Sequence, residues 1–330
     1  MSTDAEGRSR AGLWAAHPDS VHPIVSHMDH RGRIMRRQDL LRAGHTDREI
    51  RWALAHGYIF RVRHGWYALP DLADVIVRAI RVGGRLTGLA ALGTLGVFLP
   101  QPRVIDLAVP KNAAGLRRPA DRRERLRSTD GVRLHWIDSP RRSREAWDWI
   151  VSEDDALLCV LLHEQRETAI SCCDALLRYR GWSRDRLMAV FERAPQRVRS
   201  WLTMVDGRAD AWGETVARVR LHDVGIRFIP QPRVPGVGRL DGQVSPRVYV
   251  EIDGQQHDAE WTGATPSSFA NDRRRDLLLA ATGARSIRIS YPQLEGDWDL
   301  CLRAICGAME ADTGTPVVLR QKLRRSGSKS

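Results

Sequence analysis

The chain has 330 residues, of which 42% are hydrophobic and 28% are charged. This balance is typical of a globular protein, and the length is sufficient for two or three domains with cores of their own. No apolar run is long enough to span a membrane, and the N-terminal sequence MSTDAEGRSRAGLWAAHPDS lacks the continuous apolar core of a signal peptide. We therefore expect a cytoplasmic protein that has no membrane partner.

The formal net charge of the chain is +12. Arginine carries nearly all of the positive charge, because lysine occurs only at Lys111, Lys322 and Lys329. The planar guanidinium group suits phosphate groups and base edges, so nucleic acid is the first partner to consider. A coding sequence rich in G and C would produce a similar arginine bias without such a partner, and charge alone leaves both explanations open.

The cysteines are Cys159, Cys172, Cys173, Cys301 and Cys306, and no two of them form a CxxC pair. Most lie in apolar stretches with helical spacing, where cysteine behaves as a small hydrophobic residue. Their odd number and their positions are typical of a reducing compartment. We expect no zinc site.

The first folded segment is predicted over residues 26–70, after a disordered leader at residues 1–25. Its first helix stops at Ala43-Gly44, and its second begins after Thr46, with Glu49 in the capping-box position. The sequence YIFRVRHGWYALP then contains two short extended runs separated at His64-Gly65, where a hairpin turn is expected. Two helices and a hairpin in this order predict a winged helix-turn-helix.

This segment resembles the N-terminal domain of abortive-infection antitoxins from type IV toxin–antitoxin systems, mainly through LLRAGHTDREIRWALAHGYIFRVRHGWYAL. The resemblance implies that Arg48 and Arg51 on the second helix contact the DNA backbone, together with Arg61 and Arg63 on the wing. A winged helix that serves protein contacts, with solvated arginines, is the alternative.

Residues 71–205 are expected to form a connecting region of mixed α/β and helical structure. A helix, a Gly-Gly break and a second helix ending near Gly96 are predicted first, followed by the strands PRVIDLAVP and VRLHWID. The arginine-rich sequence between these strands is predicted to be a solvated loop, with phosphate contact left open. From Ser152 the apolar spacing predicts two or three helices with a stop at Gly181, and His163 on them is expected to be structural.

Residues 206–310 are predicted to form a mixed sheet flanked by helices, and residues 311–330 a basic tail. The sequence AWGETVARVRLHDVGI predicts a helix that ends at Gly225, and RFIPQPRV and GRLDGQVSPRVYVEIDG predict strands. A helix over PSSFANDRRRDLLLAATG and a strand at RSIRI follow. The fold class expected for the whole chain is α+β or α/β with several domains.

Five motifs of this segment occur in the order found in a known family of nucleases. GETVARVRLHDVGI, PQPRV, GRLD, VYVEIDGQQH and NDRRRDLLLAATGARSIRIS resemble the very-short-patch-repair-like endonuclease domain, a branch of the PD-(D/E)xK restriction-endonuclease superfamily. The resemblance runs from Arg208 to Leu294 and implies a restriction-endonuclease-like fold. Many chains of this branch couple that domain to the antitoxin-type winged helix.

Hydrolysis of a phosphodiester needs a Lewis acid at the phosphate and an activated water. Magnesium prefers oxygen ligands and is commonly bound through one or two carboxylates. Asp241 is predicted in a strand one short hairpin away from Glu251, so these two side chains are the expected ligands of Mg²⁺ or Mn²⁺, with the carbonyl of Ile252 as a third. Glu214 corresponds to the acidic residue on the family's helix and is expected to orient a water.

The chain departs from the superfamily pattern at Asp253. A lysine usually stands two residues after the second acidic residue, and here the pair is Glu251-x-Asp253 with no lysine nearby. His257 is the best remaining group for proton transfer, because the ordinary pKa of histidine lies near neutrality. Asp253 is expected to bind metal or to orient His257.

The arginines of the nuclease-like segment are further candidates for phosphate contact. Successive residues on a helix lie about 100° apart, so Arg273, Arg274 and Arg275 cannot share one face. Arg275 matches the family's motif and is expected to pair with a site carboxylate or a phosphate, and Arg218 is given the same role. Structural ion pairs with Asp276 or Glu214 are the alternative.

The sequence therefore predicts a metal-dependent DNA endonuclease, with a role in phage defence, mobile-element biology or repair by analogy alone. A non-enzymatic, antitoxin-like regulator that reads DNA and neutralises a cognate toxin is the rival interpretation. An inactivated nuclease fold that serves binding is the third. Pairing of two copies as a homodimer is left open.

Overall fold

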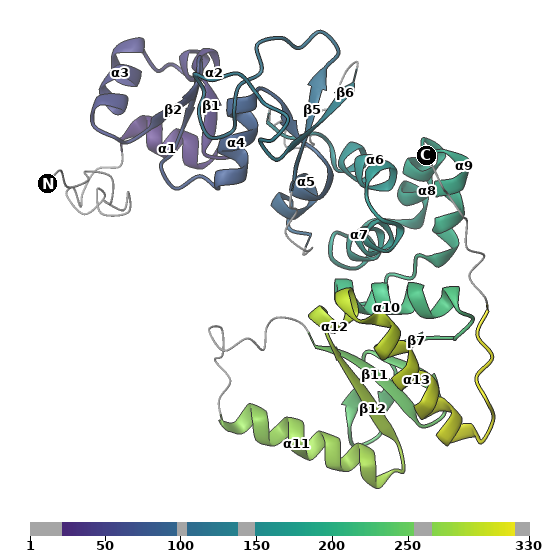
Figure 1. Cartoon of the computed structure of the whole chain (residues 1–330). Coiled ribbons are helices and arrows are strands. Elements are labelled where there is room, and N and C mark those ends of the chain that lie inside the picture. Colours follow the sequence, from purple (N-terminus) through teal and green to yellow (C-terminus); the bar gives the residue numbers. More distant parts are fainter. Residues whose placement is uncertain (1–21, 98–103, 138–148, 254–265, 321–330) are drawn as a thin grey trace, which may run out of the picture. The chain divides into compact units, whose positions relative to one another are not determined.

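The computed structural model describes residues 22–97, 104–137, 149–253 and 266–320, and its fold class is α+β (Figure 1). The chain divides into two compact units, Met1–Leu95 with Gln101–Ala156 and Gly96–Pro100 with Leu157–Ser330. Within the described residues, no helix is both long and apolar enough to cross a membrane. His257 and the last residues of the tail lie outside the described ranges.

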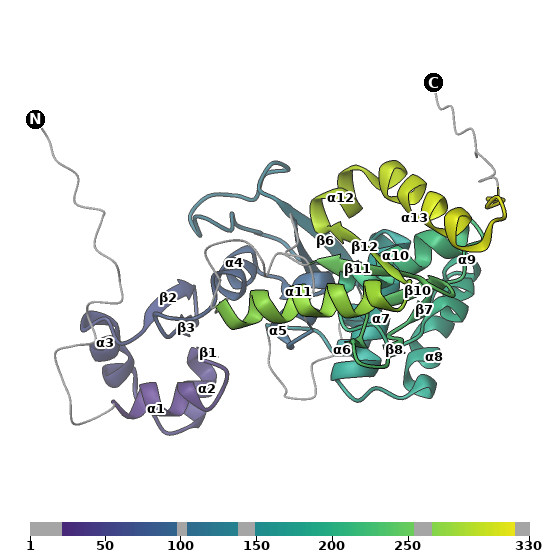
Figure 2. The ribbon, with the colours of Figure 1, turned by 90° about the horizontal axis from the view of Figure 1, so that it is seen from below.

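The first unit begins with three short helices and a three-stranded antiparallel sheet of order β1-β3-β2 (Figure 2). Its elements are α1 (Pro23–Asp29), β1 (Ile34–Arg36), α2 (Arg37–Arg42), α3 (Asp47–Ala55), β2 (Phe60–Arg63) and β3 (Trp66–Ala68). The two predicted helices and the hairpin are confirmed, including the capping box of Thr46 and Glu49. The sequence did not predict α1 or β1, and α1 begins before residue 26.

The remainder of the first unit contains two helices and a second small sheet. Its elements are α4 (Asp74–Val82), β4 (Arg85–Leu86), α5 (Gly88–Thr94), β5 (Ile105–Pro110) and β6 (Val132–Ile137). The sheet has the order β4-β5-β6, and β5 and β6 run parallel. Both predicted helices and both predicted strands are confirmed, and a long irregular connection joins β5 to β6.

The second unit opens with a run of helices that leads into the first helix of the nuclease-like segment. These are α6 (Glu153–His163), which carries the unit boundary, α7 (Arg166–Tyr179), α8 (Arg184–Glu192), α9 (Gln196–Arg199), a 3₁₀ turn (Ser200–Met204) and α10 (Trp212–Asp223). Asp174 of α7 accepts hydrogen bonds from Thr215 Oγ1 at 2.7 Å and Arg218 Nη2 at 2.6 Å. This buried network joins α7 to α10.

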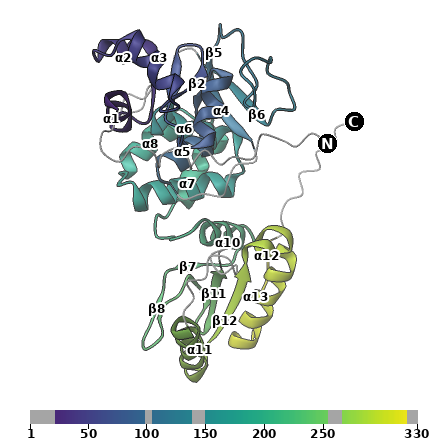
Figure 3. The ribbon, with the colours of Figure 1, turned by 90° about the vertical axis from the view of Figure 1, so that its left-hand side faces the viewer.

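A four-stranded mixed sheet of order β12-β11-β10-β7 forms the rest of the second unit (Figure 3). The elements of this part of the chain are β7 (Ile229–Pro230), β8 (Arg233–Val234), β9 (Gly238–Arg239), β10 (Gly242–Ser245), β11 (Val248–Asp253), α11 (Pro266–Ala281), β12 (Arg285–Ser290), α12 (Tyr291–Gly296) and α13 (Trp298–Thr313). β8 and β9 pair in a separate two-stranded sheet. β11 pairs antiparallel with β10 and parallel with β12. The mixed sheet flanked by helices is confirmed, whereas α12 and α13 were not predicted.

The two faces of β11 enter two different apolar clusters. Val250 and Ile252 pack in the larger cluster, with residues of α10 and α13. Tyr249 faces the other way and packs with Leu279 of α11. Because side chains alternate along a strand, Glu251 shares the α11 face with Tyr249.

Replacement of Gly242 with alanine is expected to destabilise the protein by about 1 to 3 kcal/mol, the range found for overpacked cores. A Cβ atom on this strand residue would overlap the ring of Phe228 in the larger cluster. Gly307→Ala in α13 is the matched control, because a Cβ there meets nothing within 4 Å. Urea unfolding should show the loss in the first variant and a gain of up to about 1 kcal/mol in the second. Equal midpoints would contradict the packing.

Candidate active site

The candidate site is built around the last residues of β11. The β10–β11 register pairs Gly242 with Val250, so the preceding Asp241 lies beside Glu251 and Ile252. Asp241 is in the bend before β10 rather than in a strand, which corrects the prediction by one residue. Its Oδ2 atom accepts a hydrogen bond from the backbone N–H of Ile252 at 2.8 Å. The side chain of Asp241 thereby satisfies a backbone N–H of β11 beyond the last residue that pairs with β10.

Glu214 reaches the same place from the first turn of α10, and its side chain is buried. The close approach of this helix depends on Gly213. A Cβ atom on Gly213 would lie 2.5 Å from Cγ2 of Ile252 and 2.7 Å from Cε1 of Tyr291. The helix start is thus packed directly on β11 and α12.

Gln231 lies at the site although no role was predicted for it, and it belongs to the motif PQPRV. It is one of two non-glycine residues of the described chain with positive φ, at 56°, and such backbone strain is often found at functional sites. Its backbone N–H donates to the carbonyl of Asp241 at 3.0 Å, and its Nε2 donates to Glu214 Oε2 at 2.5 Å. Its Oε1 atom is buried and has no hydrogen-bond partner.

The carboxyl groups of Glu214 and Asp241 are held in an environment that disfavours their charge. Burial and then the neighbouring Asp241 raise the pKa of Glu214 to about 7. Burial also raises the pKa of Asp241. The hydrogen bond from Ile252 N–H lowers this pKa, and the negative charge of Glu251 raises it further. Neither Glu214 nor Asp241 forms an ion pair with a basic side chain of the described residues. The charge of Arg275 lowers the pKa of Asp241 but does not reverse the upward shift.

Glu251 has a different environment, because basic side chains surround it. Its Oε1 accepts a hydrogen bond from Ser286 Oγ at 2.7 Å. Arg275 Nη2 lies 3.3 Å from Oε2, and Arg288 Nε lies 3.7 Å from Oε1. The pairing of Arg275 with a site carboxylate agrees with the role that its motif suggested, whereas Ser286 and Arg288 were not predicted.

Several predicted site residues lie elsewhere. Arg218 was expected beside a site carboxylate or a phosphate, but it is buried, pairs with Asp174 and donates to the carbonyl of Met204. This correction removes Arg218 from the candidate DNA contacts. Arg273 and Arg274 are exposed on α11. Asp253 is half-buried at the end of β11, and its predicted partner is not among the described residues.

The candidate DNA-contacting arginines of the first unit differ in exposure. Arg48 and Arg51 are exposed on α3, next to Trp52, which is 43% exposed and stacks on His56. Arg61 is exposed on β2. Arg63 is half-buried instead, and a Cβ atom on Gly83 would overlap its guanidinium group. Arg63 therefore faces α4 in the structure, which weakens its prediction as a wing contact.

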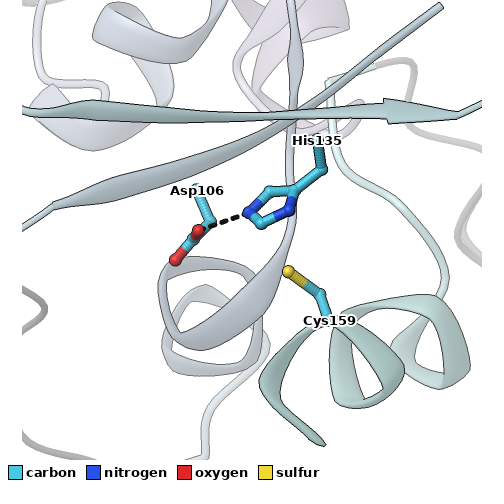
Figure 4. A group of neighbouring side chains, drawn as sticks. All are labelled: Asp106, His135 and Cys159. Carbon is cyan, nitrogen blue, oxygen red and sulfur yellow. Dashed lines mark hydrogen bonds and ion pairs between the residues drawn. The ribbon is translucent and has the colours of Figure 1, made fainter. Parts of the chain in front are cut away.

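A second pair of titratable groups, the buried Asp106 and the half-buried His135, lies in the first unit (Figure 4). His135 Nε2 donates to Asp106 Oδ1 at 2.5 Å, and Arg133 donates to both carboxylate oxygens. Burial raises the pKa of Asp106, but the hydrogen bonds from His135 and Arg133 outweigh it, and the net shift is downward. Cys159, also drawn in Figure 4, belongs to the second unit, and we assign no site across the two units.

The oxygen-rich end of β11 fits a hard divalent cation by its donor set. Glu214, Asp241 and Glu251 supply carboxylates, and Gln231 supplies a buried amide oxygen that lacks a donor. No three described acidic residues at this place have ligand atoms within 4.8 Å of one another. The arrangement therefore offers at most two of these carboxylates to a single ion.

Comparison with known proteins adds nothing to this description. No protein-family model matches the chain, and a search of curated proteins finds no match. The likeness to the endonuclease and antitoxin families thus remains an inference from the quoted motifs. The site has to be judged by its own geometry.

Proposed function

We propose that the chain is a metal-dependent DNA endonuclease that hydrolyses phosphodiester bonds. In this proposal the sheet around β11 has a restriction-endonuclease-like fold, and residues of α1 to β3 form a winged helix that holds duplex DNA. The order of helices and strands in both parts is compatible with these folds. A role in phage defence, mobile-element biology or repair follows only by analogy.

One observation carries the proposal. Two carboxyl groups, the buried Glu214 and the half-buried Asp241, have raised pKa values and form no ion pair with a basic side chain of the described residues, next to a third carboxylate. Burial of uncompensated charge is costly, so such a cluster is expected where function requires it. A divalent cation would supply the missing positive charge, and the all-oxygen donor set matches Mg²⁺ or Mn²⁺.

The residues of the site divide the work of hydrolysis. When bound, the metal would act as a Lewis acid on the scissile phosphate. Asp241 and Glu251 would hold it, and the hydrogen bond from Ile252 N–H fixes the orientation of Asp241. Glu214, with a pKa of about 7, positions the attacking water and takes its proton near neutral pH. Gln231 fixes the carboxylate of Glu214.

The second candidate function is a non-enzymatic DNA-binding regulator, in which the nuclease fold has lost its metal. The ion pairs of Glu251 favour this reading, because Arg275 and Arg288 place positive charge where a cation would bind. A regulator of the antitoxin type would also bind a cognate toxin. The arginines of α3 would serve either function.

A plasmid assay tests the proposal. Purified full-length protein and a Glu251→Gln variant are incubated with supercoiled plasmid in Mg²⁺, in Mn²⁺ and in EDTA. We expect nicked or linear product from the wild type with either metal, none in EDTA, and none from the variant, which also excludes a contaminating nuclease. Absence of cleavage by the wild type, together with retained binding to duplex DNA in a gel shift, would establish the regulator.

A further inference from the structure

Residues 111–131 connect β5 to β6 (Figure 1). The sequence of this connection is strongly basic. Its acidic residues are already engaged. Glu124 pairs with Arg118 and Arg127 at 2.9 Å, and Asp130 pairs with Arg118. Asp121 accepts a hydrogen bond from the backbone N–H of Arg123 at 2.8 Å. Further arginines of the loop are left without an acidic partner.

Three of these arginines, Arg122, Arg123 and Arg125, are exposed, and none forms an ion pair with a described residue. The side chains of Arg123 and Arg125 also form no hydrogen bond within the described chain. Exposed arginines are commonly solvated, so their number alone would carry nothing. A binding role is favoured instead by the fixed conformation of the loop that carries these arginines and by its contact with the β2–β3 hairpin.

The loop is held in a fixed conformation although it has little regular structure. Arg118 N–H donates to the carbonyl of Glu124 at 3.1 Å, and Leu126 N–H donates to that of Leu116 at 3.1 Å. Arg117 N–H donates to the carbonyl of Val82, the last residue of α4, at 3.3 Å. A loop fixed in this way loses less conformational entropy when its side chains bind a partner.

The loop is also attached to the β2–β3 hairpin. Arg122 Nη1 donates to the backbone carbonyl of Arg61 on β2 at 2.7 Å. Arg63, two residues further on the same strand, is half-buried, and burial together with the nearby Arg117 lowers its pKa. Positive charges of the hairpin and of the loop therefore crowd together at Arg63 and Arg117. A polyanion is the partner that relieves such crowding.

We propose that the β5–β6 loop and the β2–β3 hairpin form one continuous phosphate-binding ridge, through which Arg123 and Arg125 extend the contact with duplex DNA beyond the helix α3. The inference rests on the proposed DNA-binding function and adds to it a second contact outside the winged helix. Arginine contacts of this kind are made with the phosphate groups of DNA and do not depend on the base sequence.

The salt dependence of DNA binding tests this proposal. The full-length Arg123→Gln/Arg125→Gln variant is compared with Arg197→Gln/Arg303→Gln, which removes the same charge from exposed positions on α9 and α13. Binding to a short duplex oligonucleotide is followed by fluorescence anisotropy in EDTA, which prevents cleavage. We expect the slope of log K, where K is the association constant, against log salt concentration to be smaller in magnitude by about 2 in the loop variant. Each lost phosphate contact accounts for about 0.9 of this change. The control variant should keep the wild-type slope.

Two different results would overturn the proposal, and only the second would also overturn the proposed function. In the first result, the wild type binds duplex DNA, and the loop variant and the control variant have the same salt slope, whether or not that slope is smaller than that of the wild type. The loop would then not contact DNA, and the proposed contact through the winged helix would be unaffected. A wild-type protein that fails to bind duplex DNA even at low salt would overturn the proposed function as well. Circular dichroism of both variants checks that neither has unfolded.

Discussion

Replacement of Asp241 with asparagine is expected to lower the rate of metal-dependent strand cleavage about a thousandfold, which corresponds to about 4 kcal/mol of lost transition-state stabilisation. Asparagine has nearly the same shape, and its carbonyl oxygen can still accept the hydrogen bond that Ile252 N–H donates at 2.8 Å. The change removes only the negative charge from the proposed ligand. The loss should therefore fall on metal binding and catalysis and leave the fold unaffected.

Single-turnover nicking of plasmid over a range of Mn²⁺ concentrations measures this effect. Asp299→Asn is the matched control, because Asp299 is exposed on α13, and its rate should equal that of the wild type. DNA binding in EDTA should be the same for all three proteins, since arginines carry it. A rate for Asp241→Asn close to that of the wild type would exclude Asp241 as a metal ligand.

The second large effect concerns stability, and it has a definite sign with pH. The pKa of Glu214 rises from 4.5 to about 7 on folding, so between these values the folded chain binds more protons than the unfolded chain. The free energy of unfolding of the metal-free protein therefore falls as the pH rises through this window. Above pH 7 the ionised Glu214 costs about 3 kcal/mol, from about 1.4 kcal/mol per unit of pKa. Below pH 4.5 the cost is absent.

Glu214→Gln is expected to remove this cost. Urea unfolding in EDTA should show the variant to be more stable than the wild type by about 3 kcal/mol at pH 8, and equally stable at pH 4.5. The difference between the two proteins isolates Glu214 from the histidines that titrate in the same range. Glu295→Gln, at an exposed position on α12, should show no such pH dependence. A constant difference across the pH range would contradict the raised pKa.

Local signals in the sequence predicted most of the secondary structure. The capping box of Thr46 and Glu49 marks the start of α3, and the alternation of Val248, Val250 and Ile252 marks β11. These features depend on neighbours in the chain, so they are readable without tertiary structure. α13 could have been found in the same way, because Cys301, Ile305 and Ala308 follow helical spacing and are buried.

Residues whose role depends on distant partners were missed or misassigned. Arg218 pairs with Asp174, which lies 44 positions away in the sequence, and no local pattern reveals that contact. The strained backbone and orphaned amide oxygen of Gln231 arise only once β7 and α10 have packed. The hairpin register places Asp241 beside Glu251, as its sequence predicted, whereas the arginines that surround Glu251 come from other elements.

The contact at Gly213 has a consequence for finding other chains of this kind. Any side chain at this position would push against Ile252 and Tyr291 and would carry Glu214 away from its neighbours. A chain that keeps this arrangement of acids therefore needs a bare backbone immediately before the helical glutamate. A sequence search that requires glycine followed by glutamate at the start of this helix, together with the acids that correspond to Asp241 and Glu251, would be more selective than a search for the acids alone. It would exclude chains in which acidic residues occur on a strand by chance.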